Sequence, residues 1–100
     1  MQFDSWVVMV TGAASGIGLG TAKRFIDGGA TVIAVDINKE NLATAAGELG
    51  AKYVSKVCDI CKVSEIKTLM TDVENEFGRL DTLVNNAAFA NFQSPENVEE

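Results

Sequence analysis

The sequence WVVMVTGAASGIG occupies residues 6–18 and joins an apolar run to three closely spaced glycines. The β-branched apolar residues at 7–10 predict a buried parallel strand, and a helical pattern starts at Ser15 or Gly16. A strand that enters a helix through a glycine turn presents free backbone N–H groups and the positive end of the helix dipole. This stretch therefore predicts a binding site for a phosphate anion.

The rest of the chain alternates between extended and helical patterns with short connections. Strands are expected at 7–10, 31–36, 53–57 and 82–85, and helices at 16–27, 40–49 and 64–77. In the first helix, Ile17 is expected to share the buried face with Ala22 and Phe25. In the third, Ser64 is expected as the N-cap and Met70 as part of the apolar stripe.

This β-α-β-α-β-α-β order predicts an α/β fold, because helices that alternate with strands give a parallel sheet covered on both faces. Right-handed crossovers place the strands in the order 3-2-1-4 of a Rossmann-type, doubly wound sheet that is truncated after its fourth strand. No linker or repeat divides residues 1–100, so we expect them to form the N-terminal dinucleotide-binding portion of one domain.

Composition excludes several classes of function. The net charge of −6 argues against nucleic acid and anionic membrane surfaces as partners. No apolar run is long enough to span a bilayer, and the first residues do not resemble a signal peptide, so we expect a cytoplasmic protein. The chain contains no histidine, and its two cysteines are too few to form a four-ligand zinc site; no metal site is therefore expected.

The cysteines form a C-x-x-C pair, Cys58 and Cys61, between a predicted strand and a predicted helix. A thioredoxin-like redox pair would occupy such a position, and a helix N-terminus would favour the thiolate. That hypothesis leaves the glycine turn unexplained. We therefore interpret both residues as reduced structural thiols and leave a redox role open.

The glycine spacing identifies a family. Thr11 is followed by Gly12, Gly16 and Gly18 in the pattern T-G-x-x-x-G-x-G. This pattern resembles the cofactor motif of the short-chain dehydrogenase/reductase family, in its compact single-domain branch. The resemblance implies NAD(P)-dependent hydride transfer between the nicotinamide and an alcohol or ketone substrate.

Asp36 ends the second predicted strand, about 20 residues after the glycine motif, where a carboxylate accepts hydrogen bonds from the adenosine ribose hydroxyls. The same carboxylate would repel a 2′-phosphate. NADP-preferring members of the family tend to carry a basic residue at one of two positions, which are Ser15 and Ile37 here. The sequence therefore predicts NAD as the cofactor.

Two further motifs resemble those of the family. Asp59 and Ile60 resemble the pair beside the adenine ring, and residues 85–88, Asn-Asn-Ala-Ala, resemble the N-N-A-G motif at the end of the fourth strand. In that motif Asn85 holds the sheet together, and Ala88 replaces a glycine that lies close to the cofactor. The predicted cofactor-binding residues are Gly12, Ser15, Gly16, Ile17, Gly18, Asp36, Ile37, Asp59, Ile60, Asn86, Ala87 and Ala88.

No catalytic residue can be assigned. The family uses a tyrosine with a lysine four residues later, but the only tyrosine here is Tyr53, and Val57 stands at that spacing. We therefore expect the cofactor-binding part of an oxidoreductase; the alternative is a stand-alone module that binds or senses NAD without catalysis. Because the fourth strand would leave an open apolar edge, we also expect a homo-oligomer.

Overall fold

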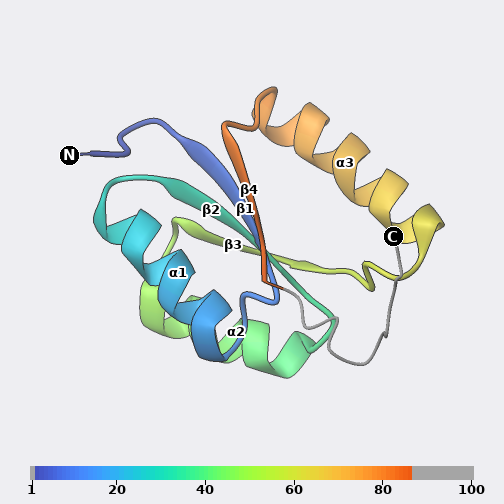
Figure 1. Ribbon diagram of the computed structural model, residues 1–100, viewed down its shortest axis with the longest axis horizontal. Coiled ribbons are helices and arrows are strands. Elements are labelled where there is room, and N and C mark those ends of the chain that lie inside the picture. The colour runs from blue at the N-terminus through green and yellow to red at the C-terminus, as the bar shows by residue number, and fades with distance from the viewer. Residues whose placement is uncertain (1, 87–100) are drawn as a thin grey trace.

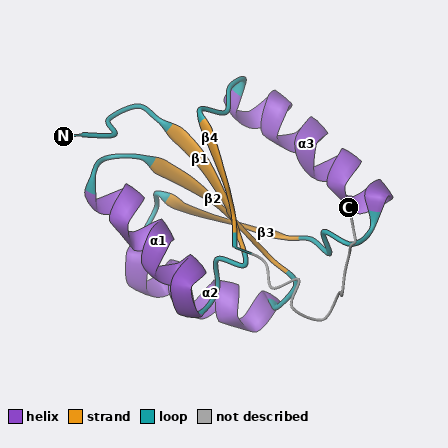
Figure 2. Cartoon of the chain, in the orientation of Figure 1, coloured by secondary structure: helices purple, strands orange, loops and turns teal. Residues whose placement is uncertain are grey.

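The computed structural model describes residues 2–86 as a parallel sheet with helices on both faces (Figure 1). The elements are β1 (Val7–Thr11), α1 (Gly16–Asp27), β2 (Thr31–Asp36), α2 (Lys39–Leu49), β3 (Tyr53–Val57), α3 (Val63–Phe77) and β4 (Thr82–Asn85). The strand order is β3-β2-β1-β4, and every pairing is parallel (Figure 2). The predicted fold class and strand order are confirmed.

The sheet separates two apolar cores. Successive side chains of a strand point to opposite faces, so Val8 and Val10 of β1 pack in the core under α1 and α2. Val7 and Met9 pack in the second core, under Leu69 and Val73 of α3. Burial on both faces explains why the central strands read as continuous apolar runs rather than as alternating patterns.

Three details of the predicted helices are wrong. α3 begins at Val63 with Lys62 as its N-cap, so Ser64 lies inside the first turn. Ile17 is 80% exposed and Met70 is 42% exposed. The reason is rotational: each lies one residue, or about 100°, from a residue of the buried face, which is set by Gly18 in α1 and Leu69 in α3.

Reciprocal hydrogen bonds join the start of β1 to the residue before β4. The Asp81 carboxylate accepts from the Val7 N–H at 2.8 Å, and the Asp81 N–H donates to the Val7 carbonyl at 2.8 Å. A hydrogen bond from Arg79, together with the one from Val7, lowers the pKa of Asp81. These contacts set the register in which β4 pairs with β1. In this register Asn85 lies opposite Thr11.

Candidate functional site at the glycine turn

The turn between β1 and α1 uses its three glycines in different ways. Gly12 and Gly16 have φ of 65° and 57°, in the left-handed region that side chains with a Cβ disfavour. Gly18 has no such φ, but a Cβ there would overlap the backbone carbonyl oxygen of Gly12. Two glycines therefore shape the turn, and the third lets the helix pack against it.

The first turn of α1 is open to a ligand. Ser15, the N-cap, is extended (φ −159°), and its side chain makes no capping hydrogen bond. The first intrahelical bond runs from the Leu19 N–H to the Ser15 carbonyl at 3.2 Å. Residues 15–17 are exposed, and no acidic side chain lies in the first turn. The first turn of α1 thus has neither a side-chain cap nor an acidic residue of its own, and its residues are exposed, a combination that favours anion binding.

The carboxylate of Asp36 lies against this turn. Its Oδ2 accepts from the Ala14 N–H at 3.1 Å, and its Oδ1 accepts from the Asn38 N–H at 2.9 Å. The side chain is half-buried, whereas Ile37 beside it is 65% exposed. A carboxylate oxygen has acceptor capacity for more than one donor, so both Asp36 oxygens keep capacity for a ligand hydroxyl. Asp36 and the glycine turn, separated in sequence, are therefore in direct contact.

Tyr53 was missed as part of this site. Its hydroxyl donates to the carbonyl oxygen of Ala13 at 2.9 Å, across a sequence separation of 40. The residue is 4% exposed, and burial, together with the nearby Asp36 charge, raises its pKa to about 12. A neutral phenol that donates to a backbone oxygen supports the turn and is unsuited to proton transfer near neutral pH. No sequence spacing signals this contact, because it spans separate elements.

The end of β3 lies beside the end of β2, where the Cys58 N–H donates to the Asp36 carbonyl at 3.1 Å. Asp59 Oδ1 accepts from the Cys61 N–H at 2.9 Å, and the Asp59 N–H donates to Glu65 at 2.8 Å. Ile60 is partly buried against the second core. Both residues thus have structural contacts of their own.

Asn85 ends β4 opposite Thr11, and Asn86 follows the strand. The Thr11 hydroxyl donates to Asn85 Oδ1 at 2.7 Å, which joins the carboxyl ends of β1 and β4. Asn86 Nδ2 is buried and has no hydrogen-bond partner among residues 2–86. Buried amide groups ordinarily have a hydrogen-bond partner, so Asn86 Nδ2 is a candidate donor to a ligand. Ala87 and Ala88 lie outside the described residues.

The two cysteines differ in burial: Cys58 is buried and Cys61 is exposed. Cys58 and Cys61 are both free, and burial, with Glu65 and Asp59 nearby, raises the pKa of Cys58. A raised pKa disfavours the thiolate that redox exchange requires. This observation favours the structural interpretation of Cys58.

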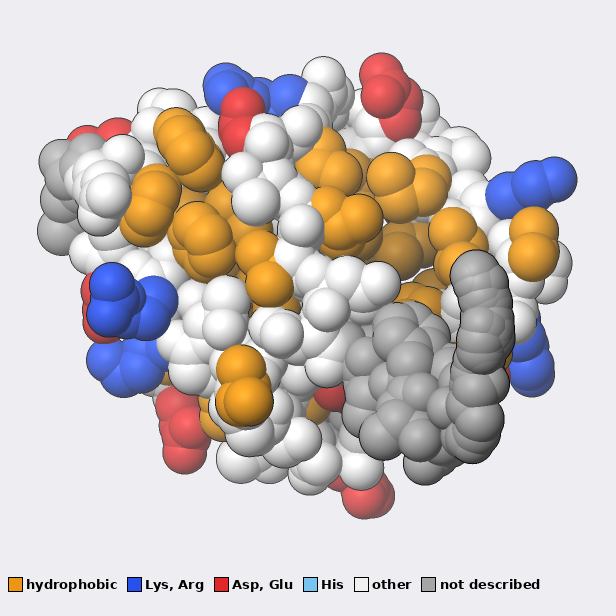
Figure 3. Space-filling model, in the orientation of Figure 1, with side chains coloured by type: hydrophobic (Ala, Val, Ile, Leu, Met, Phe, Trp, Pro, Cys, Tyr) orange, Lys and Arg blue, Asp and Glu red, His pale blue; other side chains and the backbone are white. Residues whose placement is uncertain are grey.

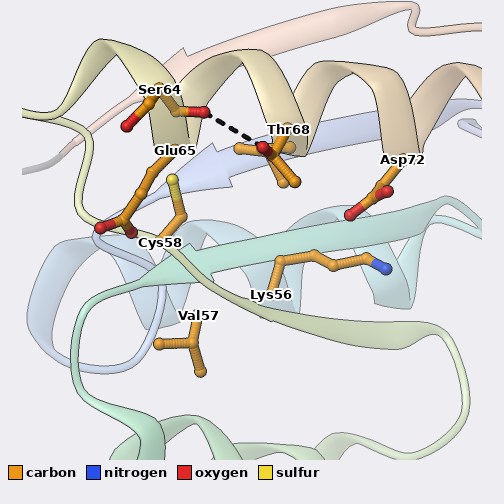
Figure 4. Close-up of a pocket in the computed structure, with 8 residues that line it drawn as sticks. Lys56, Val57, Cys58, Ser64, Glu65, Thr68 and Asp72 are labelled. Carbon is orange, nitrogen blue, oxygen red and sulfur yellow. Dashed lines mark hydrogen bonds between the residues drawn. The ribbon is translucent and has the colours of Figure 1, made fainter.

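A cleft of about 250 Å³ lies between β3 and α3, apart from the glycine turn (Figure 4). Its lining residues are Lys56, Val57, Cys58, Ser64, Glu65, Thr68, Leu69 and Asp72. None of the predicted cofactor-binding residues is among them. In the close-up, Ser64 and Thr68 are joined along α3 by the hydrogen bond from the Thr68 hydroxyl. The cleft is therefore a separate feature of the sheet edge.

The glycine turn, the Asp36 carboxylate and the strand order together specify a nucleotide-binding type of fold. The sequence model described as short chain dehydrogenase matches residues 6–100. The chain belongs to this family. In the part of the chain that the structure describes, residues 2–86, no helix has the length and apolar character to cross a membrane.

Individual family members match most of this chain. L-fucose dehydrogenase of Oryctolagus cuniculus is 43% identical over 87 residues, covering 86% of this chain and 30% of that protein. Galactitol 2-dehydrogenase of Agrobacterium fabrum is 40% identical over 88 residues, covering 88% of this chain and 34% of that protein. A crystal structure of 3-ketoacyl-(acyl-carrier-protein) reductase from Brucella melitensis complexed with NADH superposes with a TM-score of 0.81 at 37% identity, covering 94% of this chain and 41% of that one. The chain thus spans about a third of the length of the curated relatives it matches.

Proposed function

We propose that this chain forms the cofactor-binding part of an NAD-dependent oxidoreductase that transfers a hydride between NAD(H) and an alcohol or ketone. The observation that carries the proposal is the open first turn of α1 beside the Asp36 carboxylate, which accepts from the Ala14 N–H of the glycine turn that leads into α1. A pyrophosphate needs the first feature, and a ribose diol needs the second. A relative with bound NADH shares the fold.

Each part of the site has a distinct role in the proposal. The turn of Gly12, Gly16 and Gly18 would receive the pyrophosphate, with Ser15 and Ile17 at its rim. Asp36 would accept from the ribose hydroxyls, and Ile37, which is 65% exposed, would cover the adenine side. Asp59 and Ile60 would contact adenine. Asn86 has a buried amide that lacks a partner and would donate to the cofactor, with Ala87 and Ala88 following it.

The proposed preference for NAD over NADP rests on charge. The Asp36 carboxylate would lie beside the ribose 2′ position, where NADP carries a phosphate. Two neighbouring negative charges repel each other. Ser15 and Ile37 are both uncharged, so neither would offset the repulsion.

Binding without turnover is the expected behaviour of these 100 residues. The described part of the chain offers no exposed proton donor of the family type, because the Tyr53 hydroxyl is buried and donates to Ala13. We expect NADH to bind, as measured by titration of its fluorescence, and no alcohol or ketone to be converted at saturating NAD(H). Absence of NADH binding to the folded chain would overturn the proposed function. Turnover by the purified chain would overturn the assignment of catalysis to residues outside it.

The alternative hypothesis, a stand-alone binding module, predicts the same result for this chain. The two hypotheses differ in the turnover that they predict for a longer protein. If the open reading frame continues past Glu100, the oxidoreductase proposal expects turnover from the longer protein and the module proposal expects none. The relatives favour the oxidoreductase, since this chain covers only about a third of L-fucose dehydrogenase and galactitol 2-dehydrogenase.

We also propose that the purified chain self-associates through β4. Among residues 2–86, β4 pairs with β1 alone, and Leu83 is 57% exposed. Figure 3 shows hydrophobic side chains gathered in a band across the region where Figure 1 places β4 and α3. A strand edge without lysine or proline is a template for pairing with a second copy.

Sedimentation at micromolar concentration tests this association. We expect a dimer or larger species, and we expect Leu83→Lys to shift it toward monomer because a charged residue on an edge strand opposes pairing. Met70→Lys, which changes an exposed residue of α3 in the same way, is the control. A monomeric wild-type chain would refute the proposal, as would a dimer that Leu83→Lys leaves intact.

A further inference from the structure

The peptide unit between Ala13 and Ala14 is hydrogen-bonded at both ends by side chains from other strands. Its carbonyl oxygen accepts from the Tyr53 hydroxyl at 2.9 Å, and its N–H donates to Asp36 Oδ2 at 3.1 Å. Tyr53 begins β3 and Asp36 ends β2. We call these three groups in series the Tyr53–Asp36 chain.

We propose that Tyr53 is a positioning residue for the cofactor: through this one peptide it orients both the glycine turn and the Asp36 carboxylate. The inference rests on the proposed function, and it adds a residue that belongs to neither the glycine motif nor the strand-end motifs.

The two hydrogen bonds, from Tyr53 and to Asp36, are the main restraint on the orientation of this peptide. The Ala13 N–H donates to the Val35 carbonyl at 3.2 Å, which attaches the start of the turn to β2. Beyond that bond, Gly12 and Gly16 have left-handed φ, and glycine is the residue with the widest choice of backbone angles. Without the Tyr53 and Asp36 bonds, rotation of the 13–14 peptide would be opposed by local packing alone.

Burial makes the Tyr53 bond consequential. Ala13 is 0% exposed and Tyr53 is 4% exposed, so water does not replace the phenol if its hydroxyl is removed. A buried carbonyl that loses its donor is left unsatisfied and favours a rotated peptide. Rotation would turn the Ala14 N–H away from Asp36. Because hydrogen bonds in series polarise one another, the two bonds should strengthen together and fail together.

A double-mutant cycle in NADH affinity tests this coupling. We expect Tyr53→Phe, which removes only the hydroxyl, to weaken NADH binding about 5- to 10-fold when Asp36 is present. In the Asp36→Ala background the same change should cost less than about 2-fold, since the peptide no longer has a carboxylate to orient. Thr68→Val removes a hydroxyl that donates to a backbone carbonyl in α3 and should leave NADH affinity unchanged.

A spectroscopic measurement keeps the test independent of folding defects in Tyr53→Phe. The chain has one tyrosine, so 3-fluorotyrosine labels this position alone. We expect the ¹⁹F resonance to shift on addition of ADP, and also in the ligand-free Asp36→Asn variant, because both alter the bond at the far side of the peptide. The Thr68→Val variant should not shift it.

The outcomes separate the two proposals. A wild-type chain that binds neither NADH nor ADP overturns the proposed function and the role of Tyr53 with it. A chain that binds both ligands overturns the inference alone in either of two cases. The first is a Tyr53→Phe variant with lower Tm and unchanged NADH affinity, or with equal losses in both backgrounds. The second is a ¹⁹F resonance with the same chemical shift in the Asp36→Asn variant as in the wild-type chain.

Discussion

Gly16→Val is expected to abolish NADH binding in a chain that still folds. Apart from its chain neighbours and the backbone of its own helix, a Cβ at Gly16 would meet nothing within 4 Å among the described residues, so the added side chain projects into the open space in front of the first turn of α1. The proposed pyrophosphate occupies that space. We expect affinity to fall by about 100-fold or more, which corresponds to roughly 3 kcal/mol. Fluorescence titration measures the affinity, and circular dichroism reports the fold.

Backbone strain needs a matched control, because Gly16 has φ of 57° and valine disfavours that region. Gly50 has φ of 87° and likewise no atom within 4 Å of an added Cβ, and it lies at the end of α2, before β3. Gly50→Val should therefore lose similar stability and keep NADH affinity. A folded Gly16→Val chain with the affinity of the wild type would show that the turn is structural only.

Asp36→Ala is expected to narrow the preference for NAD over NADP by about tenfold or more. The substitution removes an acceptor for the ribose hydroxyls, which weakens NADH binding. It also removes the negative charge that opposes a 2′-phosphate, which favours NADPH. The ratio of the two dissociation constants, measured at one ionic strength, is the quantity to compare, because screening changes charge repulsion.

Asp27→Ala is the control for loss of one negative charge, since Asp27 is exposed at the end of α1 and pairs with Lys23. It should leave the ratio unchanged. Equal or tighter binding of NADPH than NADH by the wild-type chain would exclude the role assigned to Asp36, whatever the variants do.

Most of the fold was predictable because its signals are local. Buried parallel strands read as short apolar runs, and the helices between them read by their 3.6-residue period. Handedness of the crossovers then leaves few strand orders, and β3-β2-β1-β4 is the one observed. The glycine positions were equally readable, since the left-handed φ of Gly12 and Gly16 is a property of the backbone at those residues.

Helix faces and caps were less predictable. Ile17 fits the apolar stripe of α1, yet it is 80% exposed because the close contact of Gly18 with Gly12 rotates the helix toward the strand. Ser64 has the chemistry of an N-cap, yet α3 begins one residue earlier, at Val63. In both cases the pattern specified a helix, while packing against the sheet chose its rotation and first residue.

The amino-acid pattern alone thus established the α/β class, the strand order and the place of the glycine turn, because each depends on residues close in sequence. The support behind the turn came only from the three-dimensional structure. Tyr53 and Ala13 are 40 positions apart, and Asp36 and Ala14 are 22 apart. Asp36 and Ala14 meet because parallel strands bring their carboxyl ends to the same edge of the sheet. Tyr53 instead begins β3, beside Val32, and its side chain reaches the Ala13 carbonyl through the core that both residues share. No spacing or periodicity encodes a hydrogen bond between a side chain and a distant peptide, so its formation depends on how the strands pack.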